Sequence, residues 1–172
     1  MLSNQNEVCF PGGVYEEQDE GDICRTAARE TQEELGIDLS AIEVLGVLRP
    51  LAGKQSNSFV FPVIAVVDLT KEGKHNIEFH NKNLDEVQEV FVRPLSELVK
   101  PKHWCMTHWA TGITTPLYRD EIFNDKSTPR IWGLSGYFLF LVLSSLVPAQ
   151  FNLQYTTLKR YREKPKGKNI FQ

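Results

Sequence analysis

Cysteine is scarce in this chain: there are three, Cys9, Cys24 and Cys105, and none forms a closely spaced pair with another. An odd number without paired spacing argues against a disulfide scaffold and against a zinc ribbon, and it favours a reducing compartment. Residues 1–6 are polar, so they lack the apolar stretch of a secretory signal. Internal repeats and low-complexity segments are absent as well. We therefore expect a globular protein that works inside a cell.

Charge of either sign is missing from residues 131–149, and this stretch of nineteen residues approaches the length that spans a bilayer. Basic residues follow it, as they would on a cytoplasmic flank. Glycines and serines interrupt the stretch, however, and Pro148 ends it. We therefore expect a buried apolar helix over residues 131–147 and no membrane span.

The charge of the chain is unevenly distributed. Its 172 residues are 41% hydrophobic and 24% charged, which suits one globular domain. Residues 1–100 carry 18 acidic and 9 basic side chains, whereas residues 101–172 carry 4 and 10. A basic tail can bind nucleic acid or anionic lipid, but this one has Tyr161 as its single interleaved aromatic residue. We expect a domain over residues 1–150, a flexible tail over residues 151–172, and no nucleic-acid partner.

Three glutamates, Glu30, Glu33 and Glu34, fall within five positions of a predicted helix over residues 22–35. Neighbours three and four apart share a helix face, so these carboxylates converge and repel one another. A cation would relieve that repulsion, and hard oxygen ligands suit Mg²⁺ or Mn²⁺. The alternative is an ordinary solvated acidic face. The helix has an expected N-cap at Asp22 and a glycine C-cap at Gly36.

The remaining patterns predict a mixed fold. A buried stripe on the helix is expected at positions four apart, Ile23, Ala27, Thr31 and Leu35. Strands are expected over residues 8–10, 42–48, 59–67 and 87–92, and a short helix over residues 94–99. Residues 100–129 contain three prolines and are expected to be irregular. This order suits an α/β fold (α+β), an α/β/α sandwich around a mixed sheet.

Phe-Pro-Gly-Gly stands at residues 10–13, upstream of the glutamates. Together the two stretches resemble the Nudix hydrolases, whose motif is G-x5-E-x7-R-E-U-x-E-E-x-G-U with U a bulky apolar residue. The positions that fit are Gly13, Asp19, Arg29, Glu30, Glu33, Glu34, Gly36 and Ile37. Two extra residues fall between Asp19 and the helix, in the loop, where insertions cost little.

The resemblance points to one branch of this family. Phe-Pro-Gly-Gly, the aspartate six residues later, and Thr-Ala-Ala-Arg-Glu at residues 26–30 look like the coenzyme A diphosphatase branch. Val14 departs from this branch, which usually has a basic residue there. Residues 83–95 and 131–135 also resemble that branch, so the likeness covers residues 7–147. It is greatest to the peroxisomal animal enzymes, whereas the Ser-Lys-Leu terminus is absent. A peroxisomal, cytosolic or mitochondrial location therefore stays open.

The resemblance implies metal-dependent hydrolysis of the diphosphate bond of coenzyme A or acyl-CoA to 3′,5′-ADP and (acyl)phosphopantetheine. It implies Mg²⁺ or Mn²⁺ held by Glu30, Glu33 and Glu34, with Arg29 orienting the carboxylates. The expected catalytic residues are Glu30, Glu33, Arg29 and Glu86, where Glu86, or else Glu89, is the candidate base outside the motif. The expected substrate contacts are Phe10, Gly12 and Gly13. We expect the protein to be a monomer or a homodimer.

Two further readings stay open. A Nudix enzyme of other specificity would act on NADH, ADP-ribose or capped RNA. Such domains also place several strands before the motif, and only about a dozen residues precede it here. We therefore also consider a fold that lacks N-terminal strands and acts weakly or by binding. His103, Cys105 and His108 could ligate a metal but lack a zinc spacing, and Trp104 or Trp109 could lie against an adenine ring.

Overall fold

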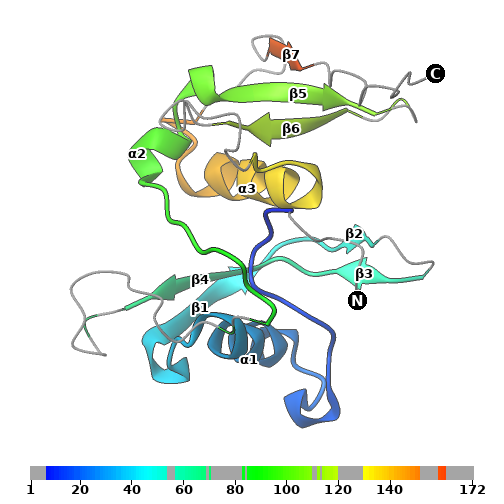
Figure 1. Ribbon diagram of the computed structural model, residues 1–172, viewed down its shortest axis with the longest axis vertical. Coiled ribbons are helices and arrows are strands. Elements are labelled where there is room, and N and C mark those ends of the chain that lie inside the picture. The colour runs from blue at the N-terminus through cyan, green and yellow to red at the C-terminus, as the bar shows by residue number, and fades with distance from the viewer. Residues whose placement is uncertain are drawn as a thin grey trace, which may run out of the picture. The chain divides into compact units, whose positions relative to one another are not determined.

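Figure 1 shows the computed structural model, which describes residues 7–53, 57–68, 70, 83, 85–109, 112, 114–119, 130–151 and 159–161. The chain forms two compact units. The N-terminal unit is Phe10–Phe91, and the C-terminal unit joins Met1–Cys9 to Val92–Gln172. The expected mixture of helices and strands is confirmed, and the strands of the described residues lie in three small sheets. The boundary expected at residue 150 stays a prediction.

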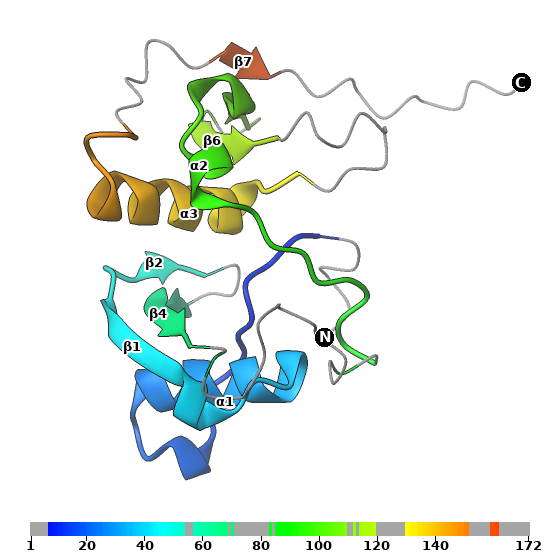
Figure 2. The same cartoon turned by 90° about the vertical axis from the view of Figure 1, so that its left-hand side faces the viewer.

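The N-terminal unit is a helix packed on a short antiparallel ladder. Helix α1 (Ile23–Leu35) contacts both β1 (Ile42–Val47) and β4 (Val63–Val67), which pair with each other. A second ladder joins β2 (Leu51–Ala52) to β3 (Phe59–Val60). Two 3-10 turns, η1 (Glu17–Asp19) and η2 (Leu39–Ala41), flank α1 in sequence. Figure 2 shows α1 against one face of the β1–β4 ladder.

The predicted strands over 42–48 and 59–67 are confirmed, with one interruption in the second. Residues 61 and 62 separate β3 from β4, and Pro62 lacks the amide that would continue a ladder. Its carbonyl accepts instead from the amide of Leu48, at 2.8 Å. The β1–β4 register also shifts between Val44 and Gly46, where β1 carries a bulge. These breaks keep both ladders short.

Both predicted ends of α1 are confirmed. The Asp22 carboxylate accepts from the amide of Cys24 at 2.8 Å, which is an N-cap interaction. Gly36 has φ of 68°, the left-handed conformation of a glycine C-cap, and its amide donates to Gln32. The prediction of a fully buried stripe on α1 is wrong, because its four positions are only half-buried. A two-stranded ladder covers less of a helix than a wide sheet does.

Two predicted strands are wrong. Residues 8–10 and 87–92 are not part of a strand, although the alternation in the second segment is typical of one. The amides of Glu86 and Val87 both donate to the carbonyl of Asn83, at 3.2 and 2.8 Å, so the chain closes a turn there. Alternation alone does not supply the neighbouring strand that a ladder requires.

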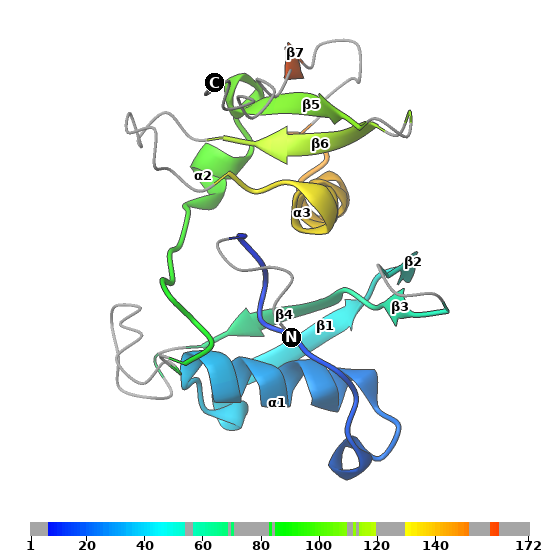
Figure 3. The same cartoon turned by 45° about the vertical axis from the view of Figure 1, so that its right-hand side comes forward.

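The C-terminal unit packs a long helix on a three-stranded sheet. Its sheet has the order β6 (Thr114–Tyr118), β5 (Trp104–His108) and β7 (Lys159–Tyr161), antiparallel on one side and parallel on the other. Helix α3 (Gly133–Leu146) packs on β6, as Figure 3 shows. Helix α2 (Leu95–Leu98) and the 3-10 turn η4 (Pro101–His103) precede β5. The helices expected over 94–99 and 131–147 are confirmed.

The expectation of irregular chain over residues 100–129 is wrong, because β5 and β6 lie there. Pro116 belongs to β6, where it is buried and faces Met106 of β5. Proline is tolerated in β6 because that strand lies at the edge of the sheet, where a missing amide breaks no inner ladder. Three residues of the expected flexible tail form β7. The other residues of that tail beyond Phe151 lie outside the described part of the chain.

Helix α3 approaches the sheet closely at one glycine. A Cβ at Gly136 would lie 2.7 Å from the carbonyl oxygen of Pro116 and 2.9 Å from that of Ile131. Trp104 is the centre of the surrounding core and makes edge contacts with Tyr118, Phe140 and Phe151. Among the residues that the structure describes, no helix has both the length and the apolar character to cross a bilayer.

Candidate active site on the glutamate helix

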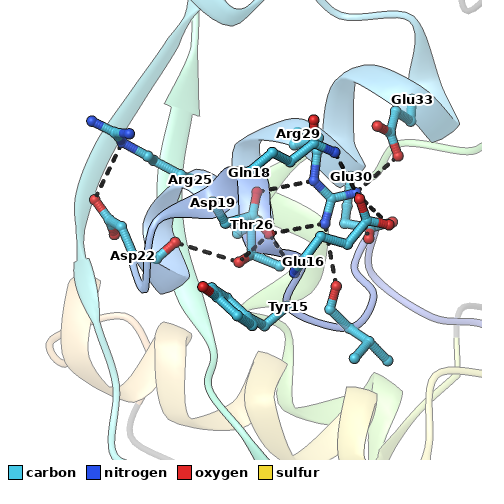
Figure 4. A network of polar contacts seen from close by, with 12 residues as sticks. Tyr15, Glu16, Gln18, Asp19, Asp22, Arg25, Thr26, Arg29, Glu30 and Glu33 are labelled. Atoms are coloured by element: carbon cyan, nitrogen blue, oxygen red, sulfur yellow. Dashed lines mark hydrogen bonds and ion pairs between the residues drawn. The ribbon is translucent and has the colours of Figure 1, made fainter.

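A cluster of polar side chains in the N-terminal unit surrounds the guanidinium of Arg29 (Figure 4). Arg29 donates from Nε and Nη2 to the two oxygens of Asp19, at 3.0 and 3.1 Å. The Asp19 carboxylate also accepts from the Thr26 hydroxyl and from the Glu16 amide, both at 2.9 Å. The hydrogen bonds from Arg29 contribute most to holding the pKa of Asp19 far below its usual range.

The other side of the same guanidinium holds two of the motif glutamates. Nη1 of Arg29 donates to Glu30 at 2.9 Å and to Glu33 at 3.0 Å, and Nη2 donates to the carbonyl of Val14 at 3.2 Å. Its bond to Asp19 is the largest cause of a raised Arg29 pKa, so the side chain stays cationic. A buried aspartate therefore fixes an arginine, and that arginine fixes Glu30 and Glu33.

The two glycines of the Pro-Gly-Gly turn lie directly against the carboxylates of α1. A Cβ at Gly13 would lie 2.2 Å from Oε1 of Glu30 and 2.4 Å from its carboxylate carbon. The backbone of Gly12 makes a hydrogen bond to the carboxylate of Glu34. We expected this turn to bring backbone close to a substrate. The structure gives Gly13 a second role, because a residue without a side chain at this position leaves room for the carboxylate of Glu30 where it now lies.

In contrast to that of Asp19, the pKa of the Glu34 carboxylate is raised. Burial raises its pKa from 4.5 to about 7, the Gly12 hydrogen bond opposes the rise, and the charges of Glu30, Glu86 and Glu33 add to it. Arg29 therefore compensates only part of the negative charge in this cluster. A bound cation would stabilise the ionised form of Glu34.

The structure also brings Glu86 toward the motif, although it lies in a distant part of the sequence. The amide of Asn83 donates to the backbone carbonyl of Glu34 at 3.0 Å, which attaches the turn over residues 83–87 to the end of α1. Asn83 stabilises this turn through its side chain, which accepts from the amide of Asp85 at 3.1 Å. Glu86 is exposed and its charge acts on Glu34. The candidate outside the motif thus lies within electrostatic reach of the cluster.

The donor set fits a hard divalent cation by its chemistry. It consists of carboxylate oxygens, which Mg²⁺ and Mn²⁺ prefer, and burial, together with repulsion within the set, raises the pKa of Glu34. In the described part of the chain, however, no three His, Cys, Asp or Glu side chains are gathered as metal ligands would be. Arg29 and Gly12 hold the glutamates in their present positions.

The other candidate residues have different surroundings. Phe10, at the start of the turn, is 50% exposed. Trp104 is buried in the core of the C-terminal unit, which excludes it as a base-stacking residue, whereas Trp109 is 37% exposed. His103 is buried with its Nε2 3.6 Å from Glu97, and His108 is exposed, so these histidines do not share a site.

The sequence interpretation missed the anchoring role of Asp19. It used Asp19 only as a match to the motif and did not foresee its burial or its contacts with Thr26 and Glu16. The available signal was the position of this acid, six residues after Gly13, together with the threonine that precedes Ala-Ala-Arg-Glu. Both residues serve the site through Arg29 and do not face a ligand themselves.

The chain is similar to known proteins over most of its length. The family model described as NUDIX domain matches residues 3–110. The mitochondrial coenzyme A diphosphatase NUDT8 of Mus musculus is 34% identical over 84% of this chain and 65% of its own length. Nudix hydrolase 3 of Caenorhabditis elegans is 33% identical over 86% of this chain and 63% of its own length. The peroxisomal coenzyme A diphosphatase NUDT7 of Mus musculus is 38% identical over 56% of this chain and 37% of its own length. The chain therefore spans less than two thirds of the length of these relatives.

Proposed function

Because this chain belongs to the Nudix family, we propose that it hydrolyses the diphosphate bond of coenzyme A or an acyl-CoA, using Mg²⁺ or Mn²⁺. The products are 3′,5′-ADP and (acyl)phosphopantetheine. The observation that carries the proposal is the cluster of motif carboxylates beside the Pro-Gly-Gly turn: Arg29 binds Glu30 and Glu33, Gly13 lies against Glu30, and burial together with the neighbouring charges raises the pKa of Glu34. The names of two matched relatives, both coenzyme A diphosphatases, support the choice of substrate.

The proposed roles follow from the contacts. Glu30 and Glu34 hold the divalent ion, with Glu33 as the next ligand, and Arg29 sets the orientation of Glu30 and Glu33. A bound divalent ion stabilises charge on phosphate oxygens and lowers the pKa of a water molecule. Glu86 is exposed near Glu34 and accepts the proton of the attacking water. Phe10, Gly12 and Gly13 contribute the substrate contacts.

A second candidate function is a Nudix pyrophosphatase for another nucleotide, such as NADH, ADP-ribose or capped RNA. The observation that favours it is Val14, which stands where the coenzyme A branch usually has a basic residue, and whose carbonyl is used by Arg29. A third candidate is a catalytically weak form that acts by binding. We propose a small-molecule substrate for the first candidate, an intracellular location and a monomer or homodimer.

The test is product analysis. Purified chain is incubated with coenzyme A and Mg²⁺, and products are resolved by liquid chromatography and mass spectrometry. We expect 3′,5′-ADP and phosphopantetheine from the wild type and from the control Glu43→Gln, an exposed glutamate of β1, but not from Glu34→Gln. No cleavage of coenzyme A, or cleavage indifferent to Glu34→Gln, would reject the proposal. Cleavage of NADH, ADP-ribose or capped RNA in a parallel panel would support the second candidate.

A further inference from the structure

Asn83 connects the turn that carries Glu86 to the end of helix α1. Its backbone amide donates to the carbonyl of Glu34 at 3.0 Å. That carbonyl belongs to the last turn of α1, where carbonyls have no partner within the helix, so a donor from outside satisfies it. Residues 83–87 are thereby attached to the glutamate helix, although they are distant from it in the sequence.

The side chain of Asn83 closes the turn itself. Its Oδ1 accepts from the amide of Asp85 at 3.1 Å, and its carbonyl accepts from the amides of Glu86 and Val87 at 3.2 and 2.8 Å. Asparagine and aspartate both form such a bond to the backbone two residues later, which mimics a backbone turn. An aspartate here would add negative charge beside Glu34 and Glu86, which already repel each other. The neutral amide of asparagine closes the turn without that repulsion.

The position of Glu86 depends on this turn. Its side chain is exposed, so packing does not hold it, and the backbone of the turn decides from where its carboxylate extends. The charge of Glu86 nevertheless reaches Glu34 and contributes to the raised pKa of that carboxyl. A general base must lie within hydrogen-bond reach of the proton that it accepts. A displacement of about 1 Å can slow a reaction by about a hundredfold.

We propose that Asn83 is a positioning residue for the hydrolysis, whose side chain holds the turn that keeps Glu86 beside the glutamates of α1. The proposal rests on the proposed function, because Asn83 acts on the same reaction through Glu86. Asn83 is not itself a catalytic residue. The contact that assigns this role is the bond from the Asp85 amide to Oδ1 of Asn83, since the other bonds of the turn use backbone atoms that any residue supplies.

The kinetic test compares Asn83→Ala, Glu86→Gln and the double variant in the cleavage of coenzyme A with Mg²⁺. We expect Asn83→Ala to lower kcat about fivefold, as the loss of one hydrogen bond would, with KM unchanged. Glu86→Gln should lower kcat at least about a hundredfold. In the Glu86→Gln background, Asn83→Ala should have no further effect, because the group that it positions is already lost. Effects that multiply in the double variant would overturn the proposal.

A second measurement does not depend on activity. Hydrogen exchange followed by nuclear magnetic resonance of the metal-free protein reports whether the amides of Asp85 and Val87 stay bonded. In Asn83→Ala both should exchange about fivefold faster than in the wild type. Asn83→Ser, whose hydroxyl can accept the same bond, should restore part of the protection and part of kcat. Unchanged exchange of the Val87 amide in Asn83→Ala would overturn the proposal.

Asp38→Ala is the matched control. The carboxylate of Asp38 accepts from the amide of Ser40 at 2.7 Å, a bond of the same kind in a turn that carries no candidate base. We expect Asp38→Ala to leave kcat unchanged, and Asn83→Ala to leave Mn²⁺ affinity unchanged. Equal losses of kcat in both variants, or weaker Mn²⁺ binding by Asn83→Ala, would overturn the positioning role. A wild type that does not cleave coenzyme A rejects the proposed function and this proposal with it, whereas an active wild type and an equally active Asn83→Ala reject this proposal alone.

Discussion

The Glu34 carboxylate should destabilise the metal-free protein at neutral pH, so that Glu34→Gln, which removes the charge and keeps the shape, should be more stable than the wild type. The sign follows from the direction of the pKa change. A group whose pKa is 4.5 when unfolded and about 7 when folded favours folding while it is protonated, and it withdraws that stability as pH rises through this range. The amide oxygen of glutamine can still accept the hydrogen bond from Gly12.

The stability gained by Glu34→Gln has an upper limit set by the size of the pKa change. A rise from 4.5 to about 7 corresponds to at most about 3.4 kcal/mol in the free energy of unfolding. Glu34 is only partly buried, and solvent screens the charges around it, so we expect about 1–2 kcal/mol. The gain should be nearly full at pH 8 and much smaller at pH 5, because folded Glu34 is then protonated.

The assay is urea unfolding with a chelator at both pH values, with Glu43→Gln as the matched control for loss of one exposed glutamate. At pH 8 we expect the free energy of unfolding of Glu34→Gln to exceed that of the wild type, and that of Glu43→Gln to equal it. If Glu34→Gln is no more stable than the wild type at pH 8, or if its advantage is the same at pH 5, burial and repulsion do not destabilise the ionised carboxylate and the reasoning is refuted.

Two other substitutions test how the site is held. Asp19→Asn removes the buried anion that binds Arg29 and leaves Arg29 with Glu30 and Glu33, so we expect a loss of about 1.5–3 kcal/mol in urea unfolding. A loss below about 1 kcal/mol would contradict the anchoring role. Gly13→Ala must displace the carboxylate of Glu30, and because the end of a flexible side chain can move, we expect the fold to survive and the Mn²⁺ affinity to fall. Gly46→Ala is the control, since its added methyl group meets nothing within 4 Å. Equal Mn²⁺ affinity of the two variants would refute the close approach of Gly13 to Glu30.

The local features of the site could be predicted from sequence. Asp22, Gly36 and the spacing of Glu30, Glu33 and Glu34 depend on contacts within a turn or two of one helix, so residue type and spacing determine them. The family resemblance also suggested Glu86, outside the motif, as a candidate base, and the structure brings it within electrostatic reach of Glu34. Near-neighbour rules and a specific motif were sufficient for these.

Features that depend on contacts between residues far apart in the sequence were harder to predict. The alternation of residues 87–92 indicated a strand, but whether a partner strand lies alongside is a matter of tertiary structure. Proline 116 argued against a strand, and only its edge position in the sheet explains why β6 tolerates it. The burial of Asp19 under Arg29 likewise depends on how the loop folds back on α1.

The most direct test of the account is the binding of Mn²⁺ itself, titrated by electron paramagnetic resonance of the free ion at pH 8. The wild type and Glu43→Gln should bind Mn²⁺ alike. Glu30→Gln and Glu34→Gln should each bind it at least about tenfold more weakly, because each lacks a ligand. Equal Mn²⁺ affinity in all four proteins would show that the glutamates of α1 are an ordinary solvated acidic face, and it would contradict the account.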